Sequence, residues 1–174
     1  QHLKAALAYV ETSHQFDVIA SIYNRLGGVF FQKEDLDQAG NFVRKSLVLR
    51  EEIGDIVGVA RSYNNLGLLG WRKGDWNTAL EDFTRCLELK RNLGDVEGLV
   101  HLHSNIGLLQ TDRGDLEAAR DHLEESLRMA QQIGHSFLEA LACMHLSRYW
   151  LVAGEWERAL EYSYSSLQTF EEIG

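Results

Sequence analysis

The segment that decides the fold runs from Tyr63 to Asn92 and reads YNNLGLLGWRKGDWNTALEDFTRCLELKRN. Its second half places apolar residues three and four positions apart, at Trp76, Ala79, Leu80, Phe83 and Leu87. That spacing is typical of one face of an α-helix. Between the halves stands Gly74-Asp75, a pair that favours the end of one helix and the N-cap of the next. The segment therefore predicts two helices joined by a tight turn.

The same pattern recurs every 40 residues along the chain, beginning at Tyr23, Tyr63, His103 and Cys143. An alanine repeats with this period at Ala39, Ala79, Ala119 and Ala159. A leucine repeats at Leu7, Leu47, Leu87, Leu127 and Leu167. Several positions conserved at one period indicate an internal repeat, whose units stack because none can bury its apolar face alone.

The repeat predicts an all-α chain of about nine helices. The first, at about residues 1–13, is interpreted as the second helix of a truncated unit. Four helix pairs follow, at 16–33/35–52, 56–73/75–92, 96–113/115–132 and 136–153/155–172. As units, these correspond to residues 1–14 and to repeats at 15–54, 55–94, 95–134 and 135–174. The absence of proline fits this prediction, because proline breaks helix interiors.

Small residues are predicted to let the helices of a pair approach closely. Gly27, Gly67 and Gly107 are assigned to the first helix of three units, and Ser147 and Ser163 break the pattern in the fourth unit. Trp76 and Trp156, which share one position of the repeat, are expected to lie in the core, as is Trp150.

Composition limits the classes of partner. The formal net charge is −9, which argues against nucleic acid, whose recognition needs a basic face. It equally argues against anionic membranes, and no apolar run is long enough to cross one. The only cysteines, Cys86 and Cys143, have neither metal-ligand nor redox spacing. They are interpreted as free thiols, which favours a cytoplasmic location.

The Asn-Leu-Gly, Gly-Asp-Trp and Ala-Leu elements of this repeat resemble the tetratricopeptide repeat (TPR) over essentially the whole chain. The 40-residue period is similar to the long-helix variety of spindle-orientation scaffold proteins and bacterial signalling regulators. The resemblance implies a right-handed superhelical solenoid of antiparallel helix pairs. It also implies that first helices line a concave groove, in which extended or helical peptides of a partner bind.

Residues on the polar face of the first helices are the candidates for this groove. They are Asn24, Arg25, Arg61, Asn64, Asn65, Leu68, Arg72, His101, Asn105, Leu108, His145 and Arg148. Asparagine offers a donor and an acceptor to a peptide backbone, and arginine binds carboxylates. The first helices are net basic within an acidic chain, so an acidic partner is expected. The alternative is that these residues form an ordinary solvated surface.

The sequence thus predicts a non-enzymatic scaffold that binds a protein or peptide. The alternative is a ligand- or peptide-sensing module of a larger signalling or transcription regulator. No nucleophile stands beside a predicted base, no glycine loop suits a phosphate, and the histidines lack metal-ligand spacing. No catalytic residue, metal or cofactor is therefore expected. Association of copies through the exposed terminal helices is expected.

Overall fold

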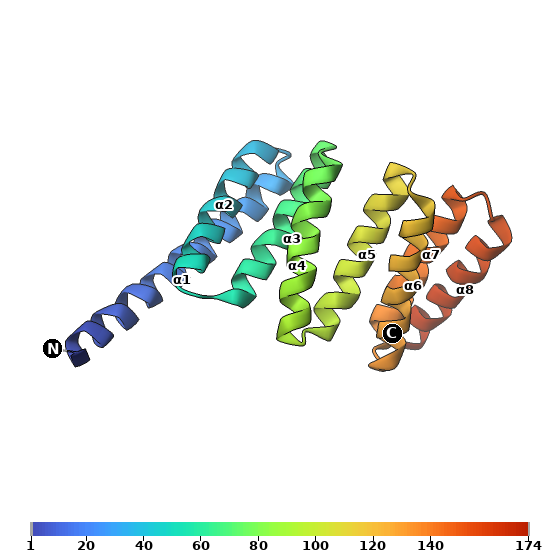
Figure 1. Cartoon of the computed structure of the whole chain (residues 1–174). Helices are drawn as coiled ribbons and strands as arrows, with labels where there is room; N and C mark the ends of the chain where they lie inside the picture. Colours follow the sequence, from blue (N-terminus) through green and yellow to red (C-terminus); the bar gives the residue numbers. More distant parts are fainter. Residues whose placement is uncertain (1, 174) are drawn as a thin grey trace. The chain divides into compact units, whose positions relative to one another are not determined.

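The computed structural model describes the backbone of residues 2–173 and the side chains of residues 15–173. Every regular element in this part of the chain is an α-helix (Figure 1). In chain order they are α1 (His2–Gln32), α2 (Leu36–Glu52), α3 (Ile56–Lys73), α4 (Trp76–Leu93), α5 (Val96–Arg113), α6 (Leu116–Gln132), α7 (Ser136–Val152) and α8 (Trp156–Ile173). The all-α class is confirmed, and these bounds lie within a few residues of the predicted ones from α2 onward.

The first two predicted helices are one continuous helix, so the described residues hold eight helices where nine were expected. The reason is the turn chemistry. His14 stands one 40-residue period before Gly54, and Gln15 stands one period before Asp55. Gly54 has a left-handed φ of 72°, which few residues other than glycine adopt. Without that glycine and the capping aspartate, the helix continues through this point.

The other turns follow the expected chemistry. Gly74 and Gly114 end α3 and α5 with φ of 82° and 87°. Asp55 accepts a hydrogen bond from the Gly58 amide at 2.9 Å, which caps α3. Where the first turn lacks glycine, Glu34 takes the left-handed conformation with φ of 60°.

The glycines of the first helices lie where the paired helix comes closest. A Cβ on Gly67 would meet the Phe83 ring at 2.5 Å, and one on Gly107 would meet the Leu123 side chain at 2.6 Å. In the fourth pair, Ser147 and Ser163 occupy these two positions, and their hydroxyl oxygens lie 2.7 Å apart in a hydrogen bond. The two departures from the pattern therefore compensate each other.

A buried serine joins the helices of three pairs. The hydroxyls of Ser46, Ser126 and Ser166 each donate to a first-helix carbonyl at 2.8 Å, and the acceptors are Ala20, Val100 and Ala140. These serines are at most 5% exposed. Buried hydroxyls require such partners, so these positions are fixed by hydrogen bonding as well as by shape.

The expectation that Trp76 and Trp156 are core residues is wrong. Trp76 is 36% exposed and Trp156 is 66% exposed. Each is the first residue of its helix, and helical side chains tilt toward the N-terminus, so these rings extend past the end of the helix. Trp150, at 7% exposed, does lie in the core. Leu7 lies outside the residues whose side chains are described.

The chain divides into two compact units, one up to Leu89 and the other from Lys90 onward. We call them unit 1 and unit 2 and describe each by itself. Among the helices that the structure describes, none combines the length and apolar character needed to cross a bilayer.

Candidate peptide-binding cleft

Unit 1 contains a cleft of about 300 Å³ lined mainly by the two first helices α1 and α3. Four of the predicted groove residues meet there: Asn24 and Arg25 from α1, and Asn65 and Leu68 from α3. The remaining lining residues are Gly27, Gly28, Phe31, Val43 and Leu69. The structure thus brings four of the predicted groove residues together at one cleft.

The two asparagines on the cleft wall are hydrogen-bonded to each other. Asn65 Nδ2 donates to Asn24 Oδ1 at 2.9 Å, which links α3 to α1. A carboxamide carries two N–H donors and an acceptor oxygen. One such bond therefore leaves hydrogen-bonding capacity on both side chains, and it holds the two amides together.

Apart from Arg25, the rest of the lining is apolar. Phe31 and Leu68 are half-buried, whereas Val43 and Leu69 are 2% and 5% exposed. Gly28 is exposed, and a Cβ added to it would meet nothing within 4 Å. Gly28 therefore keeps the cleft open, and an apolar side chain of a ligand could enter beside it.

The arginines of unit 1 differ in their partners. Arg25 and Arg61 are exposed and form no ion pair with any described side chain. Arg72, in contrast, pairs with Glu34 at 2.5 Å, and the neighbouring Lys73 pairs with Asp37 at 2.5 Å, which lowers the pKa of Asp37. Asn64 lies half-buried on α3 and is not part of the cleft lining.

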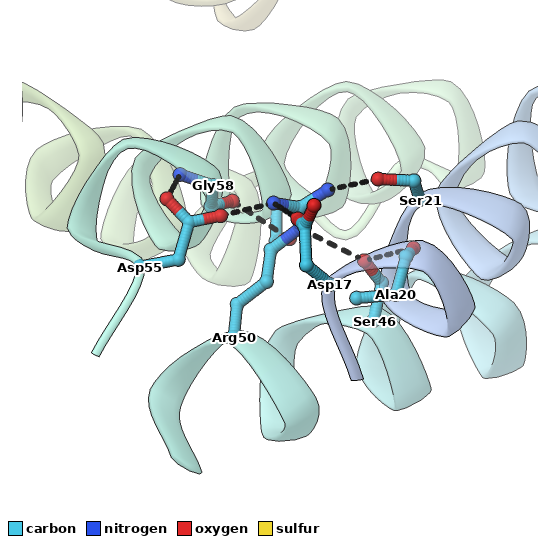
Figure 2. Close-up of polar contacts among 8 residues, drawn as sticks. Asp17, Ala20, Ser21, Ser46, Arg50, Asp55 and Gly58 are labelled. Carbon is cyan, nitrogen blue, oxygen red and sulfur yellow. Dashed lines mark hydrogen bonds and ion pairs between the residues drawn. The ribbon is translucent and has the colours of Figure 1, made fainter. Parts of the chain in front are cut away.

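Near the N-terminal end of α3, beside the middle of α1, lies a buried polar network around Arg50 (Figure 2). Arg50, on α2, is 4% exposed. Its guanidinium pairs with Asp55, lies 3.8 Å from Asp17 Oδ1, and donates to the Ser21 and Ser46 hydroxyls at 3.3 Å. The network thus connects α1, α2 and the cap of α3.

These contacts clamp the helices that carry the cleft. The Arg50 network holds the N-terminal end of α3 to the middle of α1. Near the C-terminal end of α3, the exposed Arg72–Glu34 pair adds a weaker contact to the turn that follows α1. Buried, hydrogen-bonded charges are costly to rearrange. The cleft is consequently a preformed feature of unit 1, and sequence reasoning missed the residue that positions it.

A signal for the Arg50 network was present in the sequence. A Cβ on Gly58 would collide with the Arg50 side chain, and one on Gly98 would collide with Lys90. One 40-residue period after Lys90 and Gly98, the corresponding residues are Ala130 and Leu138, which pack together. Two repeats therefore pair a cation with a glycine, and the third pairs an alanine with a leucine. This joint change indicates that the two positions are in contact.

The predicted groove residues of unit 2 are partly engaged. Arg148 pairs with Asp112 at 2.5 Å. Leu108 is buried at 7% exposed, Asn105 is half-buried, and His101 is exposed. His145 Nδ1 is buried without a hydrogen-bond partner. Burial, assisted by Arg148 and His101, lowers the pKa of His145 to about 4.

Unit 2 also contains a histidine pair that the sequence did not reveal. His103 Nδ1 and His122 Nδ1 lie 3.0 Å apart across α5 and α6. Burial and the neighbouring His122 lower the pKa of His103 to about 4, and burial lowers that of His122. Within residues 15–173 no three His, Cys, Asp or Glu side chains are grouped so that they could hold a metal ion.

The fold places the chain in the class of all-α repeat proteins built from antiparallel helix pairs. The model of the tetratricopeptide repeat matches residues 18–92 and 58–132, which together cover more than half of the chain. The chain therefore belongs to the tetratricopeptide repeat family, whose fold is generally a scaffold for binding protein partners. No curated protein sequence matches the chain significantly.

Solved structures agree with this fold. BtubC from P. vanneervenii is 19% identical, with a TM-score of 0.80 over 98% of this chain and 73% of that one. A signal transduction ATPase with numerous domains and a TPR sensor, from Pyrococcus horikoshii, is 26% identical, with a TM-score of 0.79 over 88% and 24%. A Rap protein complexed with competence and sporulation factor is 18% identical, with a TM-score of 0.77 over 88% and 43%. This chain thus spans only part of each structure's length.

Proposed function

We propose that this chain is a non-enzymatic interaction scaffold and that the cleft of unit 1 binds a peptide segment of a protein partner. The observation that supports the proposal is the pairing of a polar wall, Asn24 and Asn65, with an apolar floor around Gly28. Polar groups that fix orientation over an apolar base are typical of ligand sites. Membership of the TPR family supports a binding role over a catalytic one.

The cleft suits a particular kind of segment. The carboxamides provide hydrogen bonds for peptide N–H and C=O groups. The space above Gly28 and beside Phe31 and Leu68 accepts one apolar side chain of moderate size. The exposed guanidiniums of Arg25 and Arg61 favour acidic residues on either side of that anchor. We therefore propose an acidic segment with a single apolar anchor.

Peptide display against the intact chain tests this proposal. A random peptide library is selected on the wild-type chain, and each enriched peptide is then measured against Gly28→Leu and Gly28→Ala. A Cβ at this position meets nothing within 4 Å, so the alanine leaves most of the cleft open, whereas the larger leucine side chain is expected to occupy it. We expect acidic peptides whose binding falls about tenfold or more in Gly28→Leu only. Failure to enrich any peptide, or equal binding to both variants, would overturn the proposal.

A sensing role in a larger regulator is the second candidate. The 26% identity to the P. horikoshii ATPase, which carries a TPR sensor, favours it. A sensor must change the arrangement of its parts when it binds its ligand. Fluorescence transfer between dyes on unit 1 and unit 2 separates the two roles: a change on adding a selected peptide supports a sensor, and constant transfer supports a scaffold.

Three further features complete the proposal. We take residues 15–54, 55–94, 95–134 and 135–174 as repeats that follow a partial unit at 1–14. The buried free thiols of Cys86 and Cys143 favour a reducing compartment such as the cytoplasm. Exposed apolar residues along α8 favour association with a second copy, as argued below.

A further inference from the structure

Unit 2 holds a second cleft, of about 500 Å³, that lies between α6, α7 and α8. Its lining includes one carboxylate from each helix: Glu124, Glu139 and Glu161. The one lysine or arginine in the lining is Arg158. The cleft uses none of the residues assigned to the peptide-binding cleft of unit 1, so it is an independent feature of the molecule.

The three carboxylates form few hydrogen bonds or ion pairs with described residues of the protein. Glu139 accepts one hydrogen bond from the Gln131 amide at 3.1 Å, and Glu124 lies 4.0 Å from Arg120 Nε. Glu161 is exposed and forms no ion pair with any described side chain. Arg158, the nearby cation, forms no ion pair with described residues either. Its guanidinium lies instead over the Trp150 ring, 4.5 Å from the centroid.

The aromatic lining carries two further signs of an incomplete site. Trp150 is 7% exposed, and its indole Nε1 is buried without a hydrogen-bond partner among the described residues. Such orphaned donors are rare in folded proteins. Burial, together with Glu124 and Glu161, raises the pKa of Tyr162, as expected for a phenol in a negative environment.

The acidic character is particular to this position in the repeat. The corresponding cleft of unit 1, between α2, α3 and α4, is lined by Arg44, Lys73 and Arg85 against Asp75 and Asp82. Glu124 stands two 40-residue periods after Arg44, and Ser165 stands two periods after Arg85. Glu139 stands two periods after Val59, whereas Glu161 has an acidic counterpart in Glu81. The repeat therefore does not impose the negative charge of Glu124 and Glu139, which needs an explanation of its own.

We propose that this cleft is a second binding site, which takes an arginine or lysine side chain from a basic segment of a protein partner. The cation lies among the Glu124, Glu139 and Glu161 carboxylates, and a carbonyl of the same segment accepts from Trp150 Nε1. Cations bind favourably against both carboxylates and aromatic faces. Arg158 occupies the Trp150 face in the free protein and gives way when the partner's side chain binds.

Binding of a fluorescein-labelled peptide of alternating arginine and glycine, followed by anisotropy at about 0.15 M salt, tests the proposal, because long-range attraction is then largely screened. Wild-type chain is compared with Glu124→Gln/Glu139→Gln/Glu161→Gln. The matched control is Glu51→Gln/Glu52→Gln/Glu81→Gln, which removes the same charge from exposed positions of unit 1. We expect the first variant to bind about tenfold more weakly and the control to match the wild type.

A third variant gives an effect of opposite sign, which misfolding could not produce. Arg158→Gln removes the internal cation from the Trp150 face, so we expect the arginine peptide to bind several-fold more tightly. Circular dichroism confirms that each variant keeps its helices. Absence of saturable binding to the wild-type chain, equal weakening in both triple variants, or weaker binding in Arg158→Gln would overturn the proposal.

Discussion

At the scale of single residues, the glycine positions of the repeat differ in whether they have room for a side chain. Gly67 and Gly28 are both helical glycines of the first helices, yet their surroundings are opposite. A Cβ on Gly67 would lie 2.5 Å from the Phe83 ring, whereas one on Gly28 would meet nothing within 4 Å. One glycine is required by packing, and the other leaves room for a ligand.

This contrast predicts the stability of two alanine variants. Gly67→Ala should lower the free energy of unfolding by about 1–2 kcal/mol, because overpacking outweighs the gain in helix propensity. Gly28→Ala should be neutral or raise it by up to about 1 kcal/mol. Urea unfolding followed by circular dichroism measures both values. A stable Gly67→Ala variant would show that α3 and α4 are not in close contact there.

The buried histidines predict a pH dependence. The pKa of His103 is lowered from 6.5 to about 4 in the folded chain, so the unfolded chain takes up the proton first as the pH falls. Stability should therefore decrease between pH 7 and pH 5, by on the order of 2 kcal/mol for this group. It should level off for His103 below its folded pKa.

The His103→Gln variant isolates this contribution. It removes the titrating ring while the carboxylates, which titrate at lower pH, remain. Urea unfolding at several pH values should give a flatter profile between pH 7 and pH 5 than the wild type gives. Identical slopes for the two proteins would mean that His103 is not held neutral by the fold.

At the scale of helices, buried pairs differ from repeat to repeat while the backbone pattern stays the same. Arg50 beside Gly58 has its counterpart in Lys90 beside Gly98, and Lys90 pairs with Asp95 at 2.5 Å. In the following repeat Ala130 and Leu138 replace a cation and a glycine by an apolar contact. A cation beside a glycine in two repeats and an apolar contact in the third therefore occupy the same place between successive helices.

This equivalence predicts that the apolar pair can replace the pair of cation and glycine. Arg50→Ala alone should cost about 1–3 kcal/mol, because Asp55 and the Ser46 hydroxyl lose a hydrogen-bond partner while both aspartates keep access to water. Adding Gly58→Leu transfers the Ala130/Leu138 pair. Because the new Cβ also meets the Asp55 carboxylate, which must rotate away, the apolar contact should recover part of that loss. Urea unfolding of the two single variants and the double variant gives the coupling free energy. Additive effects would show that positions 50 and 58 do not interact.

The sequence predicted the elements better than the contacts. Spacing and turn residues placed α2 to α8, because helix periodicity and left-handed glycines act locally. The fusion of the first two helices was not predicted, although the sequence carries its cause: His14 and Gln15 stand where later repeats have Gly54 and Asp55. The structure brings Asn24, Asn65 and Leu68 together at one cleft, whereas the buried Val43 and Leu69 of its lining and the Arg50 network depend on long-range packing, which residue spacing does not report.

At the scale of the whole molecule, α8 exposes a continuous apolar stripe. Trp156, Leu160, Tyr164 and Leu167 are between 54% and 69% exposed, and they stand four, four and three positions apart. A stripe of this kind marks an interaction surface. A second copy of the chain is always present in solution, so we expect it to cover this stripe.

Sedimentation equilibrium tests this association. We expect the average mass of the wild-type chain to rise with concentration and that of Leu160→Lys/Leu167→Lys to rise less. The matched control is Val48→Lys/Val57→Lys, which substitutes two exposed apolar residues of unit 1. A wild-type chain that stays monomeric at all concentrations would contradict the expectation.

The central claim is that the cleft between α1 and α3 holds a peptide. Its most direct test is the two-dimensional amide NMR spectrum of the ¹⁵N-labelled chain, titrated with the most enriched peptide from the display selection. The account predicts that the shifts concentrate at Gly28, Phe31, Leu68 and the side-chain amides of Asn24 and Asn65. Shifts confined to the outer faces of α2 and α4, or to unit 2 alone, would contradict it.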